Sequence, residues 1–318
     1  MREAFLKLGT RSNLALLGLV TIVLSGAISI EAAIIDSGKK TSSVRDRSSR
    51  KILVHGHRGA RAVLPENNLS ALNYAIELGV DVLEFDLTMT KDKVLVLNHD
   101  RRLNAKYCLM PDALQHHLGT AIKEIYWSDL QHASCSQLPN PRFPKQKTVP
   151  GEKIIRFVDV LNWLNTSTSE NAKKVLLNIE TKLLEAKPEE SADPIEFAAE
   201  VVRLIEKEGF VSRSIVQSFD FRTLRHVKKI NPKIRTSALF KGPVKISRLP
   251  RGEARPEYVS PNYKFLDKAM TRRLQSLGFE VHPWTANSYH AWRKLRRMNV
   301  NGIITDDPKS LMDYLEKF

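Results

Sequence analysis

The sequence predicts one α/β domain folded as a (β/α)8 barrel, with an N-terminal targeting segment and a polar linker before it. From residue 52 onward, short segments rich in valine, leucine and isoleucine alternate with segments whose apolar residues recur at helical spacing. About eight such units fit the length of a TIM barrel. The competing fold is a doubly wound open sheet, which the absence of a GxGxxG pattern after the first strand disfavours.

Strands are expected where β-branched residues and leucines cluster between glycine, proline or polar residues. The expected strands are 51–55, 80–87, 94–97, 175–180, 214–217, 236–240, 258–260, 280–284 and 302–305. Helices are expected where apolar residues recur every three or four positions, several ending near a glycine. The expected helices are 69–78, 157–165, 194–208, 221–229, 268–277, 289–298 and a last one after Pro308. This alternation implies a parallel sheet with helical crossovers.

Residues 104–150 interrupt the alternation, because they contain five prolines and little periodicity. We interpret them as an irregular insertion after the second or third strand that covers the active face, since long loops in compact domains are often functional. The insertion contains both cysteines, Cys108 and Cys135. In an exported protein they would form one disulfide, with two unpaired thiols as the alternative. Their spacing does not match a zinc site.

Residues 1–32 have the order of a secretory signal peptide: basic residues, then the apolar run 14–30, then small residues that offer cleavage sites. An uncleaved membrane anchor is the alternative, although the run is slightly shorter than a span of about 20 residues. Residues 33–51 are expected to form a polar linker, of which the polar stretch 37–51 is expected to be disordered. The domain itself is expected at residues 52–318. These features predict a periplasmic or secreted protein, or one anchored to a membrane at its N-terminus.

The formal net charge of +15 favours anionic partners. Much of this charge lies in the tails and the insertion, so a solvated basic surface is the simpler interpretation, and contact with an anionic membrane surface is compatible with it. The sequence has no zinc-finger spacing, basic leucine zipper or RNP-like motif, so no nucleic acid partner is expected. A small substrate that carries phosphate remains the expected partner.

Two carboxylates, Glu84 and Asp86, lie two residues apart on an expected strand and therefore share a face. Their strand is otherwise apolar, so a buried pair needs a cation or a proton between the two groups. Carboxylate oxygens suit Ca²⁺ or Mg²⁺ better than a soft metal. Glu180 and Lys182 repeat this spacing on a later strand. They predict a third metal ligand and a phosphate contact, with a structural Glu–Lys pair as the alternative.

Two histidines follow expected strands in polar surroundings. His57 precedes Arg58, whose planar guanidinium matches a phosphate group, and His99 precedes Asp100, which can orient the imidazole ring. Two imidazoles on opposite sides of a phosphate can act as acid and base near neutral pH. His55 shares the face of His57 and is a weaker candidate for the same chemistry.

Together these motifs resemble the glycerophosphodiester phosphodiesterase family. The matching segments are HRGA at 57–60, PEN at 65–67, ExD at 84–86, TKD at 90–92, HD at 99–100, ETK at 180–182, QSF at 217–219, WTAN at 284–287 and GIITDDP at 302–308. The resemblance implies a TIM barrel, one divalent cation, and hydrolysis of glycerophosphodiesters to glycerol 3-phosphate and an alcohol.

The resemblance also implies residue roles. The family residues that match His57 and His99 are the acid–base pair, and those that match Arg58 and Lys182 contact the phosphate. The residues that match Glu84, Asp86 and Glu180 bind the metal. The sequence departs from the family pattern at Asn68 in place of a threonine, at Lys93 in place of a glycine, and at Arg156 in place of an apolar residue.

We therefore expect an exported, metal-dependent phosphodiesterase in lipid and glycerol metabolism. Trp284 and Phe219 are expected to form an apolar wall for the glycerol or a lipid tail, with barrel packing as the alternative. The nucleophile is water or the substrate's own glycerol hydroxyl. A phospholipase D-like enzyme that acts on lysolipids is the nearer rival, and a non-catalytic cationic envelope protein is the more distant one.

Overall fold

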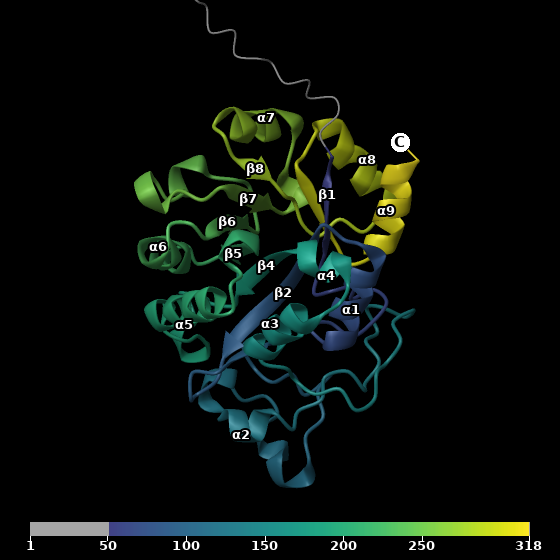
Figure 1. Cartoon of the computed structure of the whole chain (residues 1–318), viewed down its shortest axis with the longest axis vertical. Coiled ribbons are helices and arrows are strands. Elements are labelled where there is room, and N and C mark those ends of the chain that lie inside the picture. The colour runs from purple at the N-terminus through teal and green to yellow at the C-terminus, as the bar shows by residue number, and fades with distance from the viewer. Residues whose placement is uncertain (1–50, 318) are drawn as a thin grey trace, which may run out of the picture. The chain divides into compact units, whose positions relative to one another are not determined.

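The computed structural model describes residues 51–317, which form a nearly closed barrel of eight parallel strands (Figure 1). In barrel order, the strands are β1 (Leu53–Gly56), β2 (Val82–Met89), β4 (Leu176–Thr181), β5 (Ser214–Ser218), β6 (Arg235–Phe240), β7 (Tyr258–Pro261), β8 (Glu280–Val281) and β9 (Gly302–Thr305). Backbone hydrogen bonds from Asn301 to Val281 and from Ile304 to Pro283 link β9 to the β8 segment. The predicted fold class is confirmed.

Helices follow most of the strands and cover the outside of the barrel. They are α1 (Leu69–Leu78), α3 (Phe157–Thr166), α4 (Glu170–Lys174), α5 (Pro194–Lys207), α6 (Phe221–Ile230), α7 (Lys268–Ser276), α8 (Tyr289–Met298) and α9 (Pro308–Glu316). Two single 3₁₀ turns, Ile246–Arg248 and Gly252–Ala254, stand between β6 and β7 in place of a helix. None of the helices formed by residues 51–317 is long and apolar enough to cross a membrane.

Strand β2 shows how the barrel positions polar groups. All eight of its residues are buried, and successive side chains point to opposite faces. Leu83, Phe85 and Leu87 belong to the main apolar core, where the ring of Phe85 lies 5.9 Å from that of Phe157 in α3. The same alternation directs Glu84 and Asp86 to the opposite face, which is the barrel interior.

The strand expected at 94–97 is not a barrel strand. It forms β3 (Leu95–Leu97), which pairs antiparallel with β2, so that Met89 lies opposite Leu95. The connection of five residues allows only a hairpin, because a parallel crossover needs a dozen residues or more. Lys93 has a φ of 64° in this turn, a left-handed conformation that explains why the family has glycine there. The insertion therefore follows the second barrel strand.

The insertion is more ordered than its sequence indicates. It contains helix α2 (Trp127–Leu130), two 3₁₀ turns at Asp112–His117 and Ile122–Glu124, and the disulfide Cys108–Cys135. Its buried side chains form a second apolar cluster with the adjoining barrel segments: Val96, Leu103, Cys108, Met110, Ile122, Ile125, Leu130, Ala133 and Ile154. The expected signal peptide and linker lie outside the described residues, except for Lys51.

Gly59 connects β1 to α1 at a very close backbone approach, with a φ of 84°. A Cβ atom there would lie 2.5 Å from the carbonyl carbon of Ala71 in α1. We expect Gly59→Ala to lower the free energy of unfolding by about 1–3 kcal/mol more than a glycine substitution in open space. Urea denaturation measures this difference.

Gly119→Ala is the matched control, because Gly119 has a φ of 86° and a Cβ there would meet nothing within 4 Å. Its cost should be only the left-handed backbone penalty of about 1–2 kcal/mol. Equal destabilisation by the two substitutions would contradict the close packing of α1 on β1.

Candidate active site

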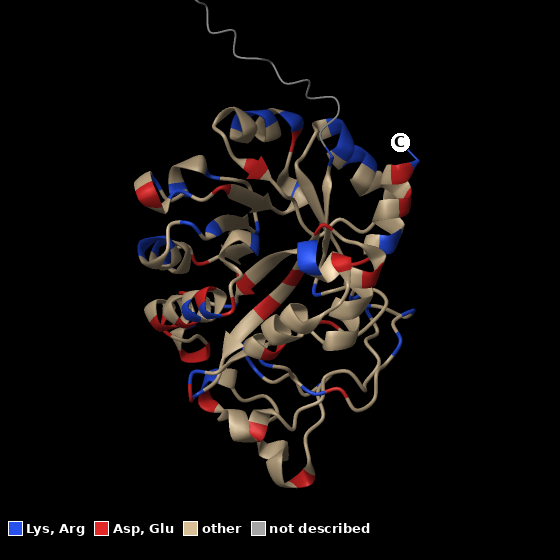
Figure 2. Ribbon diagram, in the orientation of Figure 1, with Lys and Arg blue, Asp and Glu red and all other residues tan. Residues whose placement is uncertain are grey.

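Three carboxylates meet inside the mouth of the barrel. Glu84 and Asp86 come from β2, and Glu180 comes from the neighbouring strand β4, where it lies directly opposite Asp86 in the parallel register. The acidic bands on these two strands are visible in Figure 2. One oxygen from each residue lies within 4.8 Å of the others, and all three residues are buried. The structure thus brings together the three predicted metal ligands.

The three buried carboxylates repel one another. Burial, and then the charges of Asp86 and Glu180, raise the pKa of Glu84 well above its ordinary value. Burial would also raise the pKa of Asp86, but the nearby cations Arg58 and Lys182 outweigh it and hold that pKa below its ordinary value. Glu84 accepts hydrogen bonds of 2.8 Å from the Arg58 backbone N–H and from Gln217 Nε2.

The donor set fits a hard divalent cation. All three side chains offer oxygen, which Mg²⁺ and Ca²⁺ prefer. Asp86 Oδ1 is buried without a hydrogen-bond partner among the described residues, so this oxygen is available as a ligand for a cation. Arg58 and Lys182 supply only two positive charges against three carboxylates. A divalent metal at this position would relieve the remaining repulsion.

His57 is held by a buried carboxylate at the end of β9. Its Nδ1 lies 2.5 Å from Asp306 Oδ1, so Nδ1 donates and Nε2 is left to exchange a proton. Nε2 itself lies 3.9 Å from Glu84 Oε2. Burial, and then the positive charge of Arg61, lower the pKa of His57 to about 4 although Asp306 opposes this shift. The imidazole is therefore neutral near pH 7.

His99 has a similar arrangement at the end of β3. Its Nδ1 lies 2.7 Å from Asp100 Oδ1, while Asp100 Oδ2 accepts a 2.6 Å hydrogen bond from Asn104 in the insertion. These hydrogen bonds, that from His99 first, lower the pKa of Asp100 to about 2. Both predicted histidines therefore share one motif, an imidazole whose Nδ1 is bound to a carboxylate.

The two predicted phosphate contacts border the triad. Arg58 has a left-handed φ of 51°. In this conformation its backbone N–H donates a hydrogen bond to Glu84 Oε2, while its side-chain Nε lies 3.1 Å from Asp86 Oδ2. Lys182 Nζ lies 2.6 Å from Glu180 Oε1 and 3.6 Å from Asp86 Oδ1. The Glu–Lys pair that was the structural alternative is present, and it lies in the predicted site.

Most of these groups line one cavity of about 560 Å³ at the carboxyl ends of the strands, where TIM-barrel enzymes have their active sites. They include both histidines, Arg58, Lys182, Glu84 and Glu180, whereas Asp86 is fully buried and does not line it. The predicted aromatic wall forms part of it: the rings of Phe219 and Trp284 meet edge to face with centroids 5.5 Å apart. Trp284 Nε1 donates to the Ser260 carbonyl oxygen, which fixes the indole. The cavity thus combines an acidic centre, two imidazoles, cations and an apolar wall.

Several groups that hold the site were not singled out from the sequence. Asp306 accepts hydrogen bonds from His57, Arg61 and Asn287, and Asn67 bonds both the backbone and the side chain of Asp86. All except Arg61 lie within the motifs already noted, which was the available signal. His55 is instead buried against the ring of His282, with centroids 4.8 Å apart, and belongs to the barrel packing.

Comparison with known proteins agrees with this geometry. The model of the glycerophosphoryl diester phosphodiesterase family matches residues 57–310, which is most of the chain. The chain belongs to this family. It is therefore a phosphoric diester hydrolase.

Individual relatives agree over nearly the whole domain. A glycerophosphodiester phosphodiesterase of Caldanaerobacter subterraneus is 28% identical over 84% of this chain and 99% of its own. A crystal structure of a family protein from Silicibacter pomeroyi has a TM-score of 0.75 at 25% identity, covering 85% of this chain and 94% of that one. An Oleispira antarctica phosphodiesterase, solved with the product sn-glycerol-3-phosphate, has a TM-score of 0.66 at 18% identity, covering 83% and 96%.

Asp306 is expected to orient His57 and to select its tautomer. Asp306→Asn should lower kcat on glycerophosphodiesters about 100-fold, since the amide no longer provides a carboxylate for Nδ1–H. Asp307→Asn is the matched control, because Asp307 caps α9 through Ser310 and asparagine caps equally well. Steady-state kinetics of both variants give the answer. Equal activity of the two would contradict the role of Asp306.

Proposed function

We propose that the chain hydrolyses glycerophosphodiesters to sn-glycerol 3-phosphate and an alcohol, by metal-assisted acid–base catalysis with His57 and His99. The observation that carries this proposal is one cavity lined by both imidazoles, by Glu84 and Glu180 of the carboxylate triad, and by two cations. The product bound to the Oleispira antarctica neighbour supports the same substrate class.

Each group has a role that its position supports. The triad of Glu84, Asp86 and Glu180 would hold one Ca²⁺ or Mg²⁺, which supplies a positive charge for the phosphate oxygens. Arg58 and Lys182 stabilise the negative charge that grows in the transition state. One imidazole takes the proton of the nucleophile, and the other returns a proton to the leaving alcohol. The edge-to-face pair Phe219 and Trp284 excludes water from the glycerol side.

The two-histidine mechanism predicts that His57→Ala and His99→Ala each lower turnover of glycerophosphocholine by about 10²–10⁴-fold at saturating divalent metal. His116→Ala is the control, because His116 is an exposed histidine of the insertion. Near-normal kcat in either His57→Ala or His99→Ala would refute the acid–base pair. Higher turnover of lysolipid micelles than of soluble diesters by the unaltered enzyme would favour the lysolipid alternative instead.

We also propose that the protein is exported and acts on lipid breakdown products to provide glycerol and phosphate. The basic and apolar order of residues 1–32 supports export, as does the Cys108–Cys135 disulfide, because such bonds persist in oxidising compartments. Contact with an anionic membrane surface fits the net charge of +15.

Export predicts that cell fractionation finds the protein outside the cytoplasm, and that N-terminal sequencing shows a start near residue 33. An intact N-terminus in the membrane fraction would mean an uncleaved anchor. Recovery of intact, reduced protein from the cytoplasm would contradict export.

A further inference from the structure

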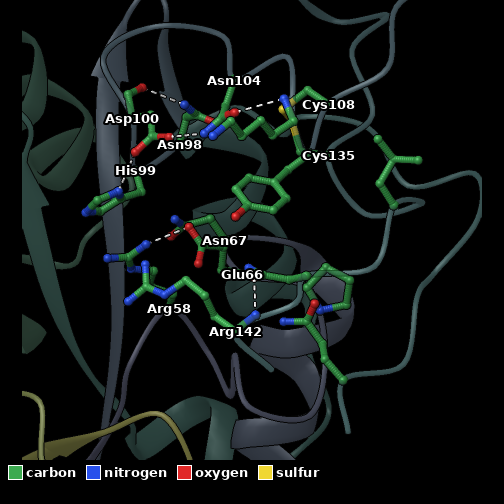
Figure 3. A pocket seen from close by; sticks show the side chains of 16 residues that line it. Arg58, Glu66, Asn67, Asn98, His99, Asp100, Asn104, Cys108, Cys135 and Arg142 are labelled. Carbon is green, nitrogen blue, oxygen red and sulfur yellow. Dashed lines mark hydrogen bonds and ion pairs between the residues drawn. A yellow bond between two sulfur atoms is a disulfide. The ribbon is translucent and has the colours of Figure 1, made fainter. Parts of the chain in front are cut away.

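A second cavity of about 310 Å³ adjoins the active-site cavity on the side of the insertion. Arg58, His99 and Arg142 line both cavities. In Figure 3, His99 and Arg58 lie on one side of this second cavity, and the disulfide Cys108–Cys135 lies on the other. A diester whose phosphate is bound at the carboxylate triad can therefore extend one half into each cavity.

The carboxylates that line this second cavity are already paired. Glu66 Oε1 lies 2.6 Å from Arg58 Nη1, and its Oε2 lies 3.4 Å from Arg61 Nη1. Asp100 accepts hydrogen bonds on both oxygens, from His99 and from Asn104. Neither carboxylate is left to bind a positively charged group, so the cavity is poorly suited to an ammonium headgroup.

Unlike these carboxylates, the cations that the insertion contributes to the cavity are not in ion pairs with other described residues. Lys106 and Arg142 line the cavity, and neither forms an ion pair with any residue between 51 and 317. Arg58 is already paired with Glu66 and with Asp86, so Lys106 and Arg142 are the lining cations that are left to meet a negative charge. Tyr107 and Asn140 add hydrogen-bonding groups. This lining suits a polar group that carries a negative charge.

The positions of the lining residues in the chain indicate which half of the substrate each cavity binds. Phe219, Trp284 and Asn287, from motifs shared with the family, line the active-site cavity, which is the place for the glycerol phosphate half common to all substrates. Lys106 and Asn140 come from the insertion, which has none of these motifs. The variable half of the substrate, its alcohol, belongs on this side.

We propose that the insertion cavity binds the alcohol half of the diester, and that Lys106 and Arg142 make the enzyme prefer alcohols that carry an additional anionic group, a carboxylate or a second phosphate. This inference rests on the proposed function and names a substrate class for it. It places the choice of substrate in two side chains outside the catalytic machinery.

Glycerophosphoserine and glycerophosphoethanolamine test this preference, because they differ by a single carboxylate. We expect kcat/KM to be about fivefold higher for the serine diester, which is the upper end of the effect of an ion pair with exposed cations such as Lys106 and Arg142. Lys106→Gln and Arg142→Gln should each lower the serine-to-ethanolamine ratio, and the double variant should bring it close to one. Lys145→Gln, an exposed cation of the insertion that lines neither cavity, should keep the ratio of the unaltered enzyme.

A second pair of substrates, glycerophosphoglycerol with and without a terminal phosphate, separates the two kinds of anion. Preference for the anionic member of either pair, lost in the double variant, supports the proposal and identifies the group. No preference in either pair, or a preference that the double variant retains, overturns it while the proposed function stands. Absence of turnover on all four diesters by the unaltered enzyme would overturn the proposed function itself.

Discussion

The repulsion among three buried carboxylates is the constraint on which the rest of the site depends. At separations up to 4.8 Å, each pair of like charges costs on the order of 3 kcal/mol at an effective dielectric of about 20. The surrounding groups are arranged to reduce this cost: the Arg58 backbone and Gln217 donate to Glu84, Asn67 donates to Asp86, and Lys182 contacts Glu180. A site so arranged still has a surplus of negative charge, which is the condition for binding a divalent cation.

The fold supplies this arrangement through strand register. Side chains two apart on β2 share the interior face, and the parallel pairing places Glu180 of β4 opposite Asp86. The first and last strands then bring Asp306 to His57, residues separated by 249 positions in the chain. The disulfide-linked insertion contributes Asn104 to the His99–Asp100 pair and forms a wall of a second cavity. Closure of the barrel thus assembles a site from segments far apart in sequence.

Most of the strands and helices and the interior carboxylates were predictable from the sequence, because hydrophobic periodicity and residue composition are local signals. Alternation along residues 82–89 indicated the interior carboxylates, and helical spacing located α1 and α8 with their observed bounds. The antiparallel pairing of β3 was missed, since a strand's direction depends on the turn before it. Asp306 was recognised only as part of a motif, because its partner comes from the other end of the chain. The apolar cluster of the insertion lacks periodicity, so sequence alone could not show that it packs.

The most direct test of the account is calorimetric titration of the purified, metal-free enzyme with Ca²⁺ and with Mg²⁺. The account predicts one metal ion per chain for at least one of the two cations, with loss of that binding in Glu180→Gln and retained binding in Glu185→Gln, an exposed neighbour on the same segment. Undiminished binding to Glu180→Gln, or no binding of either cation to the unaltered enzyme, would contradict a metal site made by Glu84, Asp86 and Glu180.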